Sequence, residues 1–156
     1  MAIRKVRLIP DDILRKKSRP VEVVDGRVQD LVEDMLEGMY KADGIGMAAV
    51  QVGVLRRVIV MDVSEERNQP IVFINPKVTH SEGSQVHREA CLSIPDLSGT
   101  VERPAIVVVE GLDRNGDPQE MRCEGDLAVV MCHEIDHLDG ILYTDVATEF
   151  FGPDED

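Results

Sequence analysis

The segment His133-Glu134-Ile135-Asp136-His137 has residue types and spacing that are typical of hydrolytic metal sites. Two histidines four residues apart on a helix project from one face, so both imidazoles can bind a single metal ion. Glu134 is then placed to move the proton of a metal-bound water. The pattern also occurs by chance on surface helices. Here residues 125–138 have apolar positions at helical spacing, and buried imidazoles need polar partners. We therefore interpret the segment as a metal-binding helix.

A catalytic site of this kind usually has a third protein ligand, and the residues alone leave its identity open. Cys91, Cys123 and several carboxylates are candidates, and spacing does not choose between the two cysteines. Cys132 directly precedes the first histidine of the motif and points about 100° away around the helix, so it fits poorly. His80 and His87 lie in strand or loop segments and are most simply surface histidines.

The elements that must position this helix follow from the hydrophobic pattern. Residues 27–41 have the spacing of an amphipathic helix, and residues 11–18 of a short one. For the motif helix we expect Asp126 as N-cap and Gly140 as C-terminal stop. Strand-like runs occupy 57–63, 71–78, 82–89, 105–112, 118–123 and 141–144, with a hairpin turn at 113–117. This order predicts a single α+β domain, with antiparallel or mixed strands packed around a central metal-binding helix.

Composition limits the class of protein. With 156 residues, 43% of them hydrophobic, the chain is large enough for one domain with a real core. A net charge of −13 disfavours direct nucleic-acid binding. Three cysteines are unsuited to a disulfide framework. Residues 1–10 lack the apolar core of a signal peptide, and no run approaches the roughly 18 apolar residues of a membrane span. We therefore expect a cytoplasmic protein with no membrane contact.

A second motif, Gly44-Ile45-Gly46-Met47-Ala48-Ala49, matches the glycine pattern of dinucleotide-binding loops. That fingerprint must follow a strand and open a helix, whereas this segment follows the predicted helix over 27–41 and leads into a strand. The glycines instead indicate a close approach of the backbone to another group. Gln51 would present an amide donor nearby.

Three segments together resemble the signature motifs of the peptide deformylases, in the same order. They are Gly44-Ile45-Gly46-Met47-Ala48-Ala49-Val50-Gln51, Glu89-Ala90-Cys91-Leu92-Ser93 and His133-Glu134-Ile135-Asp136-His137. Those enzymes remove the formyl group from the N-terminal methionine of new bacterial polypeptides. The resemblance implies a catalytic domain over residues 1–147, followed by a short acidic tail over 148–156 that we expect to be disordered.

The resemblance also implies roles for individual residues. The metal would be one divalent ion per chain, Fe²⁺ in the first place and otherwise Zn²⁺, Ni²⁺ or Co²⁺, bound by Cys91, His133 and His137. A metal-bound hydroxide would attack the formyl carbon, with Glu134 as general base and then general acid. The developing oxyanion would be stabilised by the Gln51 amide and the Leu92 backbone N–H.

The implied substrate is an N-formylated nascent peptide, extended as an added strand. Residues that would contact it are Ile45, Gly46, Ala90, Val129 and Val130. Besides Met47, which replaces a usual leucine at similar volume, this chain departs from the family pattern at three positions of the cleft. Ala90 replaces the usual glycine, which adds strain if φ is positive and otherwise narrows the cleft. His87 and Asp126 stand at usually apolar positions of the methionine pocket, where they would pair at its mouth or face solvent.

The C-terminal residues bear on a possible partner. Many family members have a basic C-terminal helix that engages the ribosome, whereas residues 148–156 here are short and acidic, so we do not expect ribosome docking by that means.

Three alternatives to this function remain open: a His-Glu-x-x-His peptidase, a deformylase with altered side-chain preference, and a catalytically weak or non-catalytic relative that binds metal or peptide. The intact motif residues favour an active deformylase.

Overall fold

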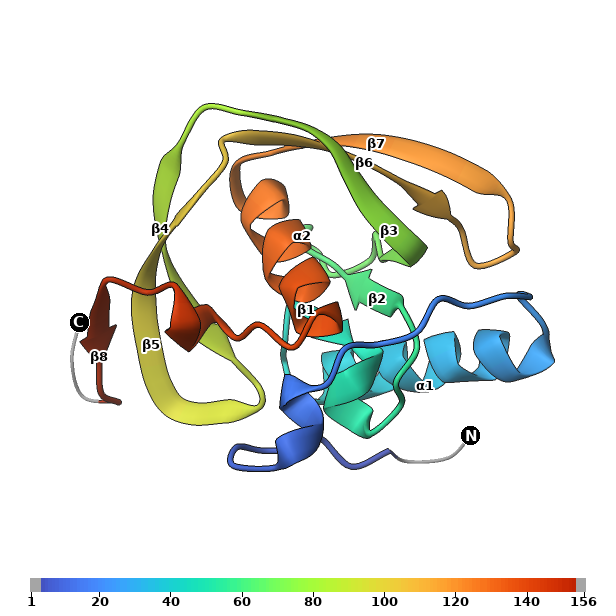
Figure 1. Cartoon of the computed structure of the whole chain (residues 1–156), viewed down its shortest axis with the longest axis horizontal. Coiled ribbons are helices and arrows are strands. Elements are labelled where there is room, and N and C mark those ends of the chain that lie inside the picture. Colours follow the sequence, from blue (N-terminus) through green and yellow to red (C-terminus); the bar gives the residue numbers. More distant parts are fainter. Residues whose placement is uncertain (1–3, 154–156) are drawn as a thin grey trace.

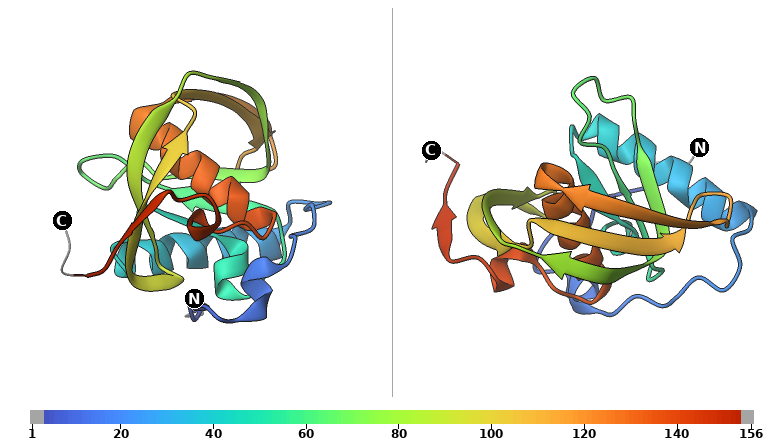
Figure 2. Two further views of the ribbon diagram at one scale, coloured as in Figure 1. Left: turned by 60° about the vertical axis from the view of Figure 1, so that its left-hand side comes forward. Right: turned by 90° about the horizontal axis from the view of Figure 1, so that it is seen from above.

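Helix α2 (Gly125–Leu138) runs through the middle of the molecule and packs against strands of two antiparallel sheets (Figures 1 and 2). The computed structural model describes residues 4–153. The five-stranded sheet has the order β1 (Gly46–Ala48), β2 (Val58–Met61), β3 (Ile71–Glu82), β6 (Ile106–Leu112) and β7 (Pro118–Glu124). The three-stranded sheet has the order β4 (Gln85–Cys91), β5 (Ile94–Arg103) and β8 (Glu149–Phe151). The predicted α+β class is confirmed.

The long amphipathic helix is α1 (Gly26–Lys41), which differs from the prediction by one residue. The Asp25 carboxylate caps its first turn by accepting hydrogen bonds from the backbone N–H groups of Arg27 and Val28. Its buried stripe packs against β1 and β2, and consists of Leu31, Val32, Met35, Leu36 and Met39. Full burial of such a side chain contributes about 1.5–3 kcal/mol, so this stripe fixes the position of β1 beside the site.

Strand β2 is buried on both faces because α1 covers one side of the sheet and α2 the other. The predicted hairpin turn between β6 and β7 is confirmed. The Asp113 carboxylate accepts from the backbone N–H groups of Asn115 and Asp117, and Gly116 has the left-handed φ of +87° that the turn requires.

Other local predictions were wrong. Strand β5 was not expected, because its polar residues and Pro95 break the strand pattern. Residues 141–144 do not form a strand; instead, a 3₁₀ turn spans Tyr143–Asp145, where the Asp145 carboxylate accepts a hydrogen bond from the Leu142 N–H. The segment near residues 11–18 has only a 3₁₀ turn, Asp12–Arg15.

Two corrections concern the termini of elements. Glu124, not Asp126, occupies the N-cap position of α2, without a side-chain capping bond, and Asp126 lies in the first turn. Residues 148–156 are not wholly disordered, because Glu149–Phe151 pairs with β5 as strand β8. The remainder of that prediction, at residues 154–156, lies outside the described residues.

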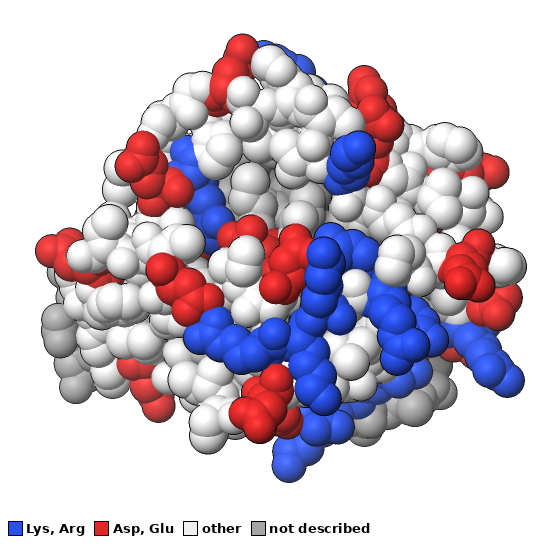
Figure 3. Space-filling model, viewed as in Figure 1, with Lys and Arg blue, Asp and Glu red and all other residues white. Residues whose placement is uncertain are grey.

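Charge is distributed unevenly over the surface. Seven of the 17 Lys and Arg residues lie in residues 4–19, together with only two carboxylates, and basic side chains gather on one face (Figure 3). Several arginines of this segment form ion pairs within the fold, such as Arg4 with Asp34 and Arg15 with Asp145. The basic face therefore helps to fasten the N-terminal segment to the domain. No helix in the described range is long and apolar enough to cross a membrane.

Candidate metal centre and cleft

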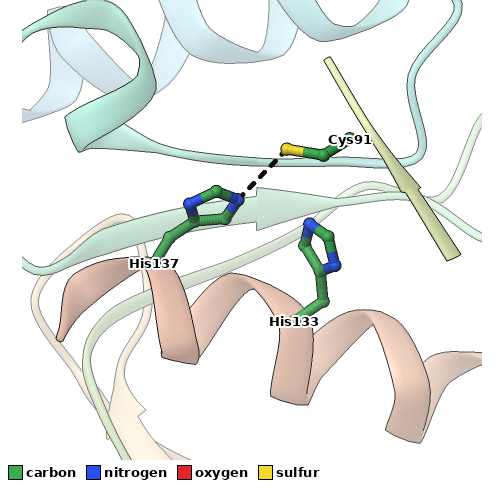
Figure 4. Close-up of side chains that lie close together, drawn as sticks. All are labelled: Cys91, His133 and His137. Carbon is green, nitrogen blue, oxygen red and sulfur yellow. Dashed lines mark hydrogen bonds between the residues drawn. The ribbon is translucent and has the colours of Figure 1, made fainter. Parts of the chain in front are cut away.

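Cys91, His133 and His137 lie together where the end of β4 meets α2 (Figure 4). One potential ligand atom from each side chain lies within 4.8 Å of the others. The Cys91 Sγ is 3.3 Å from Nε2 of His137. Both histidines lie on one face of α2 because they are one turn apart. Cys123 is fully buried in the hydrophobic core and does not belong to this group.

A layer of charged groups lies directly behind the histidines, and sequence reasoning gave it no role. Nδ1 of His133 is 2.8 Å from Oε1 of Glu89. The Arg103 guanidinium donates to both oxygens of Glu89, at 2.7 and 2.8 Å, and also to Asp136 at 2.7 Å. This cluster joins β4, β5 and α2. Glu89 belongs to the motif Glu89-Ala90-Cys91-Leu92-Ser93, and Asp136 to the motif of the two histidines. Their need for a cationic partner is the one feature of the sequence that could have indicated a role for Arg103.

The electrostatics of this cluster follow from its burial. Burial alone would raise the pKa of Glu89, but hydrogen bonds from Arg103 and His133 outweigh it and lower this pKa to about 2. Burial would lower the pKa of His133, yet the facing Glu134, Cys91 and Glu89 raise it well above its ordinary value. Burial and the nearby His133 lower the pKa of His137 to about 3. The pocket thus attracts positive charge at His133, while His137 stays neutral.

The three side chains fit a divalent metal ion. A thiol and two imidazoles are ligands typical of zinc and iron sites. Histidines that bind metals usually donate their other ring N–H to a carboxylate, and His133 meets Glu89 in that way. Its Nε2 consequently remains available on the side of Cys91. The negative groups that raise the pKa of His133 would also favour a cation in place of a proton.

Glu134 lies beside this group with only 4% of its surface exposed. Burial raises its pKa to about 7, which suits a group that both accepts and donates a proton near neutral pH. Its Oε1 has no hydrogen-bond partner among the described residues. Gly46 makes room for this carboxylate, because a Cβ there would lie 2.5 Å from Oε2. The close approach predicted from the glycine motif is thus made, at Gly46, to Glu134.

Gln51 is held in a fixed orientation next to Cys91. Its Oε1 accepts from the Ala48 N–H at 2.9 Å, while Nε2 donates to Oγ of Ser93 at 3.1 Å and lies 3.5 Å from Sγ of Cys91. These contacts fix which end of the amide faces the site. Leu92 follows Cys91 directly and also lines the cavity.

A cavity of about 380 Å³ opens beside these residues. It lies between β1 and β4, which are edge strands of the two different sheets. The structure brings to its wall all the sequence-predicted site residues except His137, namely Ile45, Gly46, Gln51, Ala90, Cys91, Leu92, Val129, Val130, His133 and Glu134.

The three departures from the family pattern also lie at this cavity or next to it. Ala90 lines it and is not among the non-glycine residues with positive φ, so its methyl group narrows the cleft without backbone strain. His87 lines the cavity and pairs with Asp126, with Nε2 and Oδ1 3.1 Å apart. This pair connects β4 to the first turn of α2.

In this α+β domain, the His-Glu-x-x-His motif of the central helix faces a thiol and a cavity. This arrangement is that of a metal-dependent hydrolase. The model of the polypeptide deformylase family matches residues 3–150. The chain belongs to the polypeptide deformylase family. This confirms the resemblance seen in the three motifs.

Individual relatives agree over nearly the whole chain. The chain is 54% identical to a peptide deformylase of Alkaliphilus metalliredigens over 93% of this chain and 97% of that protein. It is 50% identical to one of Acetivibrio thermocellus over 99% and 89%. The crystal structure of a peptide deformylase from Legionella pneumophila superposes with a TM-score of 0.91 at 44% identity, covering 94% and 87%. A peptide deformylase from Synechococcus elongatus in complex with actinonin gives 0.89 at 40% identity, covering 92% and 80%.

Proposed function

We propose that this chain removes the formyl group from the N-terminal formyl-methionine of newly made polypeptides. The observation that carries this function is the convergence of Cys91, His133 and His137 beside the buried carboxylate of Glu134, at a cavity between two strand edges. Membership of the polypeptide deformylase family supports the same reaction.

Cys91, His133 and His137 would hold one divalent metal ion. When bound, such an ion lowers the pKa of water and supplies a nucleophile at neutral pH. Glu134 accepts the proton of the attacking water and passes it to the departing amine nitrogen. Its pKa of about 7, raised by burial, matches both steps.

Two donors stabilise the negative charge that develops on the formyl oxygen. They are Nε2 of Gln51, which lies 3.5 Å from Sγ of Cys91, and the backbone N–H of Leu92. The bond from Ala48 to Oε1 keeps the Gln51 amide nitrogen turned toward the site, so no reorientation is needed during reaction. Losing one such donor typically lowers the rate by about 10²–10³.

The peptide binds as an extended strand between β1 and β4. Both strands are edges, so each offers backbone groups to an added strand. Ile45 and Gly46 line one side and Ala90 the other, while Val129 and Val130 form the apolar wall that accepts the methionine side chain. The His87–Asp126 pair gives this pocket a polar edge.

The remaining assignments follow from the reaction. We propose Fe²⁺ as the metal because the resemblance to the deformylases implies it. Zn²⁺, Ni²⁺ and Co²⁺ are possible substitutes, because ligand type alone does not select among these ions. Nascent peptides are the partner, and the cytoplasm, where they are made, is the location. Residues 148–156 are acidic, so we do not expect this segment to offer a basic surface for docking to the ribosome.

Formate release tests this function directly. The protein is loaded anaerobically with Fe²⁺ and offered formyl-Met-Ala-Ser, alongside the variants Glu134→Ala and Cys91→Ala. We expect formate from the wild type, no turnover with full metal content in Glu134→Ala, and loss of metal in Cys91→Ala. Near-normal rates in Glu134→Ala would contradict its role as proton carrier. Unchanged metal content in Cys91→Ala would contradict the ligand assignment, and cleavage at internal peptide bonds would indicate a peptidase.

A further inference from the structure

The connection between β2 and β3 forms hydrogen bonds to the backbone just before β1. Residues 43–45 line the cavity, and β1 pairs with β2 at the edge of the five-stranded sheet. The Ile45 carbonyl accepts a hydrogen bond from the Asp62 N–H at 2.9 Å, and the Gly44 carbonyl accepts one from Nη2 of Arg67. Both bonds bind the edge of the cleft to residues 62–69, which do not line the cavity.

Arg67 has an unusual backbone conformation that these contacts maintain. Its φ is +57°, in the left-handed region that is unfavourable for residues other than glycine. Besides Gly44, its guanidinium donates to the Asp62 carbonyl at 2.9 Å and lies 5.3 Å from the centre of the Tyr40 ring. Strain of this kind persists only where surrounding contacts impose it, and it often marks a functional constraint.

The anchor of this loop is the carboxylate of Asp62, which is fully buried. It accepts hydrogen bonds from the Tyr40 hydroxyl at 2.6 Å and from the backbone N–H groups of Ser64 and Gln69 at 2.8 and 3.1 Å. Burial would raise its pKa, but these donors and the Ser64 hydroxyl outweigh burial and lower it. The carboxylate thus fixes the loop to α1, and Arg67 transmits that position to Gly44.

We propose that Arg67 is a positioning residue for the peptide: by fixing the Gly44 carbonyl it holds the edge of β1 at the spacing from β4 that an added strand requires. This inference rests on the proposed function. It predicts that Arg67 affects the binding of those substrate residues that pair with β1. It should not affect the binding of the formyl group, which lies at Cys91 and Glu134. The contribution of Arg67 should therefore grow with peptide length.

The test measures binding apart from turnover. In a Glu134→Gln background that prevents hydrolysis, metal-loaded protein is titrated with fluorescently labelled formyl-Met-Ala-Ser, and formyl-methionine amide is measured by competition. Loss of one or two backbone hydrogen bonds corresponds to about 3- to 30-fold in affinity. We expect Arg67→Met to weaken tripeptide binding by that factor and to change the Kd of the amide less than twofold. Arg67→Lys, with the charge but without the planar pair of donors, should give an intermediate value.

Arg57→Met is the matched control. Arg57 is also partly buried and donates to two backbone carbonyls, those of Ser18 and Leu138, but it does not line the cavity. It should lower stability without changing the ratio of the two affinities. Equal weakening of both ligands by Arg67→Met, or an unchanged tripeptide Kd, would overturn the positioning role. Absence of formate from the wild type, with length-dependent binding intact, would overturn only the proposed reaction.

Discussion

Replacing Arg103 with methionine tests whether the charged cluster behind His133 maintains the metal centre. The Arg103 side chain is 7% exposed and that of Glu89 only 4%, so methionine would remove the guanidinium from a buried carboxylate and leave it only His133 as a cationic partner. Breaking a buried pair in this way costs about 3–5 kcal/mol. The pKa of Glu89 points the same way. Arg103 and His133 together lower it from 4.5 to about 2, which corresponds to roughly 3 kcal/mol of stability at neutral pH.

The sign of the pH dependence follows from the lowered pKa. Because the folded-state pKa of Glu89 lies below its unfolded value, the stabilisation is fully present above about pH 4.5 and is lost as the pH falls toward 2. Urea unfolding of metal-free protein at pH 7 should therefore separate wild type from Arg103→Met by about 3–5 kcal/mol, and the difference should shrink at pH 3. Metal affinity should fall about 10- to 100-fold, because His133 loses the support of an oriented Glu89.

Two comparisons make this prediction specific. Arg122→Met removes an exposed ion pair with Glu124, in which both side chains are 58% exposed, and should change stability by less than about 1 kcal/mol. The double variant Arg103→Met/Glu89→Gln should be less destabilised than the sum of its single variants, because the uncompensated charge is gone. A loss below about 1 kcal/mol in Arg103→Met, or strict additivity, would refute the reasoning.

Three further substitutions test other contacts. Gly46→Ala puts a Cβ 2.5 Å from Oε2 of Glu134. Formate assays should show kcat lower by about 10²-fold or more with metal content unchanged. A normal kcat would contradict the close packing of Gly46 against Glu134. Gly140→Ala combines a φ of +75° with a Cβ 2.4 Å from the Arg15 carbonyl oxygen; it should cost about 2 kcal/mol or more and lower Tm by several degrees in thermal unfolding. His87→Ile removes a polar group from the cavity wall. It should raise the ratio of kcat/KM for formyl-Met-Ala-Ser to kcat/KM for an analogue with serine in place of methionine severalfold. If this ratio did not change, His87 would have no part in selecting the substrate side chain.

The elements that could be predicted from the sequence are those whose pattern is local. Helix α2 occupies residues 125–138 as expected, because apolar spacing defines it and Gly140, with its left-handed φ of +75°, ends it. The elements that could not be predicted depend on partners far away in the chain. Strand β8 has exposed polar and apolar residues, and only its pairing with β5 makes it a strand. The turn at Tyr143–Asp145 is likewise stabilised by Arg15, which pairs with Asp145 across 130 residues.

The same distinction applies within the site. The motifs predicted which side chains meet at the cavity, since each motif is a short segment with recognisable residue types. They did not predict Arg103 or Arg67, because neither arginine belongs to a motif and each acts across a gap in sequence, to Glu89 fourteen residues away and to Gly44 twenty-three residues away.

Both arginines have the same physical role, which explains why no local pattern signals them. A planar guanidinium carries five N–H donors in a fixed geometry, so one side chain can bind acceptors from two or three elements at once. Arg103 joins β4 to α2 behind the histidines, and Arg67 joins the β2–β3 connection to the backbone before β1. A lysine would keep the charge but not the simultaneous bonds. Arg103→Lys should therefore retain less than half of the stabilisation that Arg103→Met removes, and full retention in urea unfolding would mean that charge alone, not geometry, assembles the centre.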